Sequence, residues 1–163
     1  MAKNKEEKTN VMRVLEQKKI AYTAHTYPHE EGMAVDGVTV AKSMGFDPAI
    51  VFKTLVARGA SKQYYVFDVP VAENLDLKKA AKAVGEKSIE MIHQKELLPL
   101  TGYVHGGCSP VGMKKLFPTV FHSSAENLET MIVSAGKIGY QVELSPRDLA
   151  ALVRAKFADI IVE

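Results

Sequence analysis

Apolar residues recur along the chain with two periods, and these periods divide it into short helices and strands. After Thr9, whose hydroxyl can cap a helix, the spacing of Val11, Val14 and Leu15 predicts the first helix. The same helical spacing of apolar residues follows four further capping residues: Asp36, Asp76, Ser124 and Ser145. A single helical turn is predicted over 94–98. The last helix has the strongest start signal, because a proline and an acid follow its cap.

Runs of β-branched and aromatic residues between these helices predict strands. The runs cover 20–26, 51–58, 63–71, 88–92, 117–121, 130–134 and 140–144. Turn residues separate them, and the chain shows no repeat, low-complexity tract or linker. We therefore expect a flexible, charged N-terminus over 1–8, followed by a single α+β domain over 9–163 with a mostly antiparallel or mixed sheet.

Composition narrows the class of protein. The chain has 163 residues, of which 47% are hydrophobic and 25% charged, which is typical of one globular domain. Its net charge of +2 is too small to indicate a nucleic-acid-binding protein by itself. A single cysteine excludes an internal disulfide, and the chain has no secretory signal or membrane-spanning apolar run. These features predict a cytoplasmic protein with neither a membrane nor DNA as a partner.

The predicted strand over 51–58 carries a charge between apolar neighbours. Alternate side chains share one face of a strand, so Lys53 lies on the side of Val51 and Leu55, whereas Thr54 faces the other way. One interpretation is an edge lysine whose ammonium reaches water. The other is a lysine that serves a site.

The segment over 102–115 is rich in glycine and predicts a loop that presents main-chain groups. It contains Gly106, Gly107 and Gly112, and the only cysteine stands beside a serine and a proline. Glycine allows close approach of a ligand to the backbone, and proline fixes the corner that follows. A tight turn between two strands is the alternative interpretation.

Cys108 is the obvious candidate nucleophile, with His105 three residues before it. A lone cysteine is more often a small buried residue, so a Cys108-dependent hydrolase or thiol-transfer enzyme is one of two open interpretations. The run from His105 to Gly107 is similar to an esterase oxyanion loop. No Gly-x-Ser-x-Gly motif follows, which argues against a Ser-His-Asp hydrolase.

Metal and cofactor chemistry have little support in the sequence. His25, His29, Glu30 and Glu31 could be metal ligands, but Pro28 and the β-forming residues before it argue against the helix that would align them. The chain has no Walker A loop and no dinucleotide-binding fingerprint. We therefore expect no metal and no cofactor.

Five separated motifs agree with one family. They are His-Thr-Tyr at 25–27, Phe-Lys-Thr-Leu at 52–55, Leu-Asp-Leu-Lys-Lys at 75–79, Thr-Gly-Tyr at 101–103 followed by Gly-Gly-Cys-Ser-Pro at 106–110, and Val-Ser-Ala-Gly-Lys at 133–137. Together they resemble the YbaK/EbsC family of bacterial aminoacyl-tRNA deacylases. The family is similar to the editing insertion of bacterial prolyl-tRNA synthetases, which shares the lysine and the Gly-x-x-x-Pro loop. The resemblance covers nearly the whole chain.

The resemblance implies a curved mixed sheet enclosed by helices, and a reaction that removes cysteine from mischarged Cys-tRNA(Pro). In this branch the substrate thiol attacks its own ester carbonyl and leaves a cysteine thiolactone, so the enzyme is an ester hydrolase or lyase-like. A related branch removes alanine from Ala-tRNA(Pro) with water, and a broader deacylase or a non-catalytic aminoacyl-tRNA-binding relative is also compatible with these motifs.

The resemblance also assigns the site. Lys53 would hold the terminal adenosine and favour the anionic transition state, and main-chain amides over 106–109 would stabilise the oxyanion. The catalytic positions are Lys53, Gly106, Gly107 and Ser109, and the substrate-binding positions are Tyr27, Thr54, Tyr103, Cys108, Pro110 and Ser134. Many relatives have an aliphatic residue at the position of Cys108, and some have an acid at the position of Gln141.

The expected partners are the aminoacyl-tRNA 3′ end and, transiently, prolyl-tRNA synthetase. The lysines that could contact tRNA are scattered: Lys78, Lys79, Lys82, Lys114 and Lys115. Such a surface predicts modest tRNA binding that depends strongly on salt. The synthetase would then supply the selectivity among tRNAs.

Overall fold

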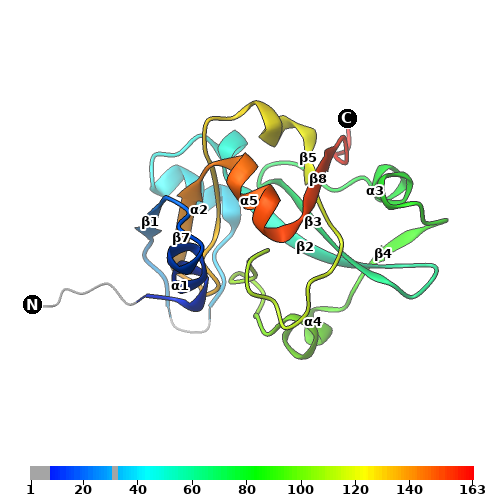
Figure 1. Ribbon diagram of the computed structural model, residues 1–163, viewed down its shortest axis with the longest axis horizontal. Coiled ribbons are helices and arrows are strands. Elements are labelled where there is room, and N and C mark those ends of the chain that lie inside the picture. Colours follow the sequence, from blue (N-terminus) through cyan, green and yellow to red (C-terminus); the bar gives the residue numbers. More distant parts are fainter. Residues whose placement is uncertain (1–7, 31–32) are drawn as a thin grey trace, which may run out of the picture.

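The computed structural model describes residues 8–30 and 33–163, and the strands within them form two sheets (Figure 1). The predicted flexible N-terminus lies outside the described residues except for Lys8. The α-helices are α1 Asn10–Gln17, α2 Gly37–Ser43, α3 Leu77–Val84, α4 Gln94–Thr101 and α5 Pro146–Val153. Two 3₁₀ helices are η1 Pro48–Ile50 and η2 Ser123–Asn127. The strands are β1 Tyr22–Thr26, β2 Phe52–Gly59, β3 Tyr64–Pro70, β4 Ile89–Met91, β5 Thr119–His122, β6 Met131–Ser134, β7 Tyr140–Leu144 and β8 Ala155–Ala158.

The larger sheet has the strand order β4-β2-β3-β5-β8 and is mixed. Strands β4, β2 and β3 pair antiparallel, whereas β3, β5 and β8 pair parallel. The smaller sheet has the order β1-β7-β6 and is antiparallel throughout. A bridge between Val51 and Ile132 joins the two sheets where β2 meets β6. The predicted mixed α/β class is therefore confirmed, with the strands divided between two sheets.

The helices begin where polar side chains accept hydrogen bonds from unpaired backbone amides. Thr9 accepts from the amide of Met12, Asp36 from Thr39, and Ser145 from Asp148. Asp76 accepts from the amides of the second and third helical residues of α3. Four of the predicted caps are therefore confirmed.

Three local predictions differ from the structure. Ser124 does not cap a helix, because the 3₁₀ helix η2 already begins at Ser123. The helical turn predicted over 94–98 continues to Thr101 through Pro99, which lies inside α4. Strand β8 was not predicted; it has only four residues, and it pairs in parallel with β5 at the sheet edge.

Apolar side chains cover both faces of the larger sheet. On one face Phe67, Val69 and Ala57 pack against α3, and on the other Val56 and Val66 pack against α4 and the glycine-rich loop. A further cluster fills the space between the smaller sheet, α1 and α5. In Figure 1 the smaller sheet and α1 lie at the left, and the β2–β3 hairpin extends to the right beside β4 and α3.

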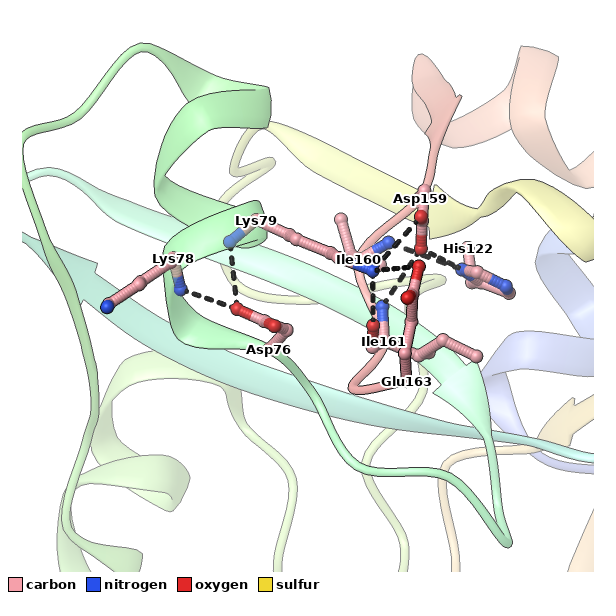
Figure 2. A network of polar contacts seen from close by, with 8 residues as sticks. All are labelled: Asp76, Lys78, Lys79, His122, Asp159, Ile160, Ile161 and Glu163. Carbon is pink, nitrogen blue, oxygen red and sulfur yellow. Dashed lines mark hydrogen bonds and ion pairs between the residues drawn. The ribbon is translucent and has the colours of Figure 1, made fainter.

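A polar cluster ties the last residues of the structure to α3 (Figure 2). The Lys79 ammonium lies 3.1 Å from the Asp159 carboxylate and 2.9 Å from the carbonyl of Ile161. It also lies 3.3 Å from the Glu163 carboxylate. Lys78, by contrast, points away from the cluster and is exposed. Of these two lysines, only Lys78 is left to meet an external anion.

His122 contributes to the same cluster from β5. Its Nδ1 accepts a hydrogen bond of 3.3 Å from the amide of Ile160, so in the neutral ring the proton is on Nε2. Burial lowers the pKa of His122, and the nearby Asp159 carboxylate offsets part of this effect. Protonation of Nδ1 would remove the acceptor that the Ile160 amide uses.

This geometry predicts a pH-dependent stability. Because the pKa of folded His122 lies below the ordinary histidine value of about 6.5, its contribution is complete above that pH and is lost as pH falls through the folded pKa. We expect His122→Leu, which removes the acceptor, to lower the free energy of unfolding by about 1 kcal/mol at pH 8. Urea denaturation should show this difference shrinking as the pH is lowered from 7 to 5. A difference that stays constant over that range would contradict the assignment.

Candidate active site

A pocket of about 360 Å³ lies where the two sheets meet. Its walls come from β2, from the start of α2, from Ser134 and Gln141 on the smaller sheet, and from the glycine-rich loop. Ser134 and Gln141 are cross-strand partners, so the pairing of β6 with β7 presents both to the pocket. The pairing of strands far apart in the sequence therefore builds this site.

Lys53 lies in the pocket wall and is half-buried. Burial lowers the pKa of Lys53, while the carboxylates of Asp36 and Glu73 act in the opposite direction. A partly dehydrated ammonium interacts more strongly with a developing negative charge than one in bulk water. Lys53 therefore does not act as a simple edge lysine, and its environment suits a site for an anion.

The glycine-rich loop is packed between two other segments. Gly106 has φ of +90°, and a Cβ at this position would lie 2.6 Å from the Cβ of Ala34. A Cβ on Gly107 would lie 3.0 Å from the amide nitrogen of Ile138. Both positions require glycine, the first for its backbone conformation and both for close packing. The loop is consequently held by the segment before α2 and by the turn between β6 and β7.

The loop amides differ in what they bind. The amide of Gly107 donates a hydrogen bond of 3.0 Å to the carbonyl of Val104 and is used within the loop itself. Within residues 8–30 and 33–163 no acceptor pairs with the amides of Gly106 and Cys108, and both residues line the pocket. These two amides are therefore the candidates for binding an oxyanion.

The structure brings six of the ten predicted site residues to the pocket wall. These are Tyr27, Lys53, Thr54, Gly106, Cys108 and Ser134. The other four belong to the glycine-rich loop but do not line the pocket: Tyr103, Gly107, Ser109 and Pro110.

Loop residues that do not line the pocket hold the shape of the loop. Ser109 is fully buried, and its hydroxyl accepts from the amide of Val111 at 3.2 Å. The Tyr103 hydroxyl donates to the carbonyl of Val111. Pro110 borders a separate cavity of about 170 Å³ beside α1 and α5. Their positions suit support of the loop rather than contact with a ligand in the pocket.

Cys108 lines the pocket but is poorly suited to attack a substrate. Its side chain is buried, and burial together with the nearby Asp68 carboxyl raises the pKa of the thiol to about 12. At neutral pH the thiolate fraction is then very small. His105 also lines the pocket but is exposed, and within the described residues no hydrogen bond joins it to Cys108. The geometry therefore argues against Cys108 as the nucleophile.

Two buried polar residues near the pocket were not assigned a role from the sequence. Gln141 is buried, and its side-chain oxygen has no hydrogen-bond donor within the described part of the chain. Asp68 is fully buried on β3, and its Oδ1 accepts from the hydroxyl of Thr54 at 2.5 Å. A carboxylate inside an otherwise apolar strand is a sequence signal that could have identified Asp68.

The histidines considered as metal ligands have protein partners instead. His25 Nε2 lies 2.9 Å from the Glu143 carboxylate, and a ring nitrogen of His29 lies 3.1 Å from the carbonyl of Tyr27. Glu31 lies outside the described residues. Among residues 8–30 and 33–163 no group of three or more histidine, cysteine, aspartate or glutamate side chains could hold a metal. The same residues contain no helix with the length and apolar character needed to cross a bilayer.

Comparison with known proteins gives the family. Residues 29–152 match the model of the aminoacyl-tRNA editing domain. The chain belongs to this family. Editing is the hydrolytic release of an amino acid from tRNA, so the editing domain is an enzyme of the aminoacyl-tRNA deacylase class, as predicted.

Two kinds of relative support the assignment. The editing domain is 45% identical over 161 residues to the EbsC protein of Enterococcus faecalis, and the match covers 98% of each chain. The name of that protein proposes Cys-tRNA(Pro)/Cys-tRNA(Cys) deacylase activity. The fold matches a crystal structure described as a proposed trans-editing enzyme for prolyl-tRNA synthetase, with a TM-score of 0.78, 24% identity and coverage of 94% and 95%. A hypothetical protein of known structure gives a TM-score of 0.82 at 20% identity, with coverage of 93% and 99%.

The environment of Cys108 predicts low thiol reactivity. With the pKa raised to about 12, modification of the native editing domain by a disulfide reagent at pH 8 should be slower than that of an exposed thiol by a factor of about 100 or more. Unfolding in guanidinium should restore the ordinary rate, because the denatured chain exposes its only cysteine. Ala60→Cys, at an exposed position, provides the reactive control within the same fold. Equal native rates for the two thiols would contradict the burial of Cys108.

Proposed function

We propose that this chain is a trans-editing enzyme that removes cysteine from Cys-tRNA(Pro). The observation that carries the proposal is a pocket lined by Lys53, Gly106 and Cys108, in which the two loop amides have no acceptor within the described residues and burial raises the pKa of the Cys108 thiol to about 12. The relative from Enterococcus faecalis, whose name proposes cysteinyl-tRNA deacylation, supports the choice of substrate.

The two serines that the family motifs assign to the site favour a substrate that brings its own nucleophile. The Ser134 hydroxyl accepts from the amide of Gly136 at 3.1 Å, and the Ser109 hydroxyl is buried behind the loop. Among residues 8–30 and 33–163, no histidine or carboxylate base is a hydrogen-bond partner of either serine. The thiol of a bound cysteinyl group needs only to be held close to its own carbonyl carbon.

The proposed reaction is an intramolecular transfer. The substrate sulfur forms a bond to the ester carbonyl carbon, the bond from that carbon to the ribose oxygen breaks, and the thiol proton ends on the released ribose hydroxyl. Water then opens the cysteine thiolactone to free cysteine. Lys53 raises the thiolate fraction and stabilises the negative charge on the carbonyl oxygen, together with the amides of Gly106 and Cys108.

Substitution of Lys53 tests the role of its charge. We expect Lys53→Ala and Lys53→Met to lower kcat/KM for Cys-tRNA(Pro) by a factor of about 100 to 1,000, because a preorganised charge at the oxyanion is removed. Cys108→Ser serves as the matched control within the pocket. The measurement is release of labelled amino acid from Cys-tRNA(Pro), Ala-tRNA(Pro) and Ser-tRNA(Pro) under single-turnover conditions.

The three esters distinguish the candidate mechanisms. The substrate-thiol mechanism predicts rapid release of cysteine, little release of alanine or serine, and activity in Cys108→Ser. Equal release of alanine would show that water is the nucleophile, and loss of activity in Cys108→Ser would restore the Cys108 mechanism. Binding of all three without release would indicate a non-catalytic relative.

Selectivity among tRNAs provides a second test. The exposed lysines are scattered, and Lys79 is already paired with Asp159 and Glu163, so we expect the editing domain alone to bind tRNA weakly and with strong salt dependence. Adding prolyl-tRNA synthetase should raise the ratio of kcat/KM for Cys-tRNA(Pro) over Cys-tRNA(Cys). An unchanged ratio, measured at a fixed salt concentration, would remove the synthetase from the proposal.

A further inference from the structure

A buried carboxyl group stands directly behind one wall residue of the pocket. Asp68 on β3 and Thr54 on β2 are cross-strand partners in the antiparallel hairpin. The Thr54 oxygen lies 2.5 Å from Oδ1 of Asp68, which is a short hydrogen bond. Thr54 lines the pocket, whereas Asp68 is fully buried and does not. Asp68 can therefore affect a ligand only through Thr54.

The surroundings of Asp68 offer its charge little compensation. Within the described residues no donor reaches Oδ2, and no cation forms an ion pair with the carboxyl group. On the neighbouring strand β5 its register partner is Phe121, and from the glycine-rich loop the nearby titratable group is the Cys108 thiol. A buried carboxylate with one hydrogen bond is costly, so the neutral acid is favoured.

Burial accordingly raises the pKa of Asp68 to about 7, and the hydrogen bond from Thr54 offsets only part of this effect. Near neutral pH both forms of the carboxyl group are then populated. The two forms impose opposite roles on the threonine hydroxyl.

Hydrogen-bond chemistry defines these roles. An ionised carboxylate can only accept, so Thr54 must donate its proton to Asp68 and presents only lone pairs to the pocket. A protonated carboxyl group can donate to the Thr54 oxygen, and the threonine proton is then free to point at an oxygen of a ligand. The ester carbonyl and the ribose oxygens of an aminoacyl-tRNA end are such acceptors.

We infer that Asp68 is a positioning residue that determines, through Thr54, whether the pocket wall donates or accepts a hydrogen bond, and that the donating form binds the substrate ester. The inference rests on the proposed function for its substrate. This role gives a reason for a buried carboxyl group that has no ion pair within the described residues and is the cross-strand partner of a residue of the pocket wall. Activity should then decline as Asp68 ionises.

The test compares pH profiles of kcat/KM for Cys-tRNA(Pro) between pH 5.5 and 8.5. In Asp68→Asn the amide can donate to Thr54 at every pH, so the ratio of variant to wild-type kcat/KM should rise by about tenfold between pH 6 and pH 8. Taking this ratio cancels the ionisation of the substrate thiol, which is common to both proteins. Thr54→Ser should retain the wild-type profile, and Thr54→Val should lose the dependence together with about tenfold of activity at pH 6. Glu126→Gln, an exposed carboxylate on η2, is the matched control and should give a flat ratio.

A second readout separates this inference from the proposed function. Binding of 3′-cysteinylamino-3′-deoxyadenosine, an amide analogue of the tRNA end that cannot be hydrolysed by ester cleavage, should show the same pH dependence of the Asp68→Asn to wild-type affinity ratio. If this pattern appears in a protein that releases no amino acid, the proposed function fails and the role of Asp68 stands. If the wild type releases cysteine but both ratios stay constant in folded variants, Asp68 has only a structural role and the inference is overturned.

Discussion

The antiparallel pairing of β2 with β3 is the interaction on which the rest of the structure depends. These two strands form the centre of the larger sheet, and their register places Lys53 and Thr54 at the junction with the smaller sheet. One face of the hairpin packs on α3 and the other on the glycine-rich loop. A shift of one residue in this register would exchange the two faces, and it would move both the lysine and the threonine away from their present positions.

The pocket combines main-chain amides, whose positions are fixed by packing, with side chains whose properties depend on their surroundings. The packing of the glycine-rich loop between two segments fixes the main-chain amides. Their positions depend on the backbone alone and not on a side-chain rotamer. Lys53 and Thr54, in contrast, are tuned by their surroundings: burial and two carboxylates act on the lysine, and a buried acid acts on the threonine. This division matches the proposed substrate-thiol reaction, in which the protein contributes only orientation and electrostatics.

Local signals in the sequence predicted most of the secondary structure. Capping side chains such as Thr9, Asp36 and Asp76 act on the residues that follow them, so their effect is visible in a short window. Strand β8 was not predicted, because it is stabilised by parallel pairing with β5, which is distant in the sequence. Ser124 was wrongly read as a cap because its neighbours, and not its own preference, decide where η2 begins.

The sequence predicted less of the site than of the secondary structure, because the site also depends on contacts between distant segments. Family motifs located Lys53 and the loop, but they could not distinguish Gly106, which borders the pocket, from Ser109, which lies behind it, because this depends on which way the loop turns. The requirement for glycine at positions 106 and 107 also limits how such a protein can diversify. Any side chain at these two positions would collide with Ala34 or crowd the backbone at Ile138, so the course of the loop backbone is fixed. Differences in substrate preference between relatives must then come from side chains around this fixed backbone, such as the one at position 108 and those of α2 and the smaller sheet.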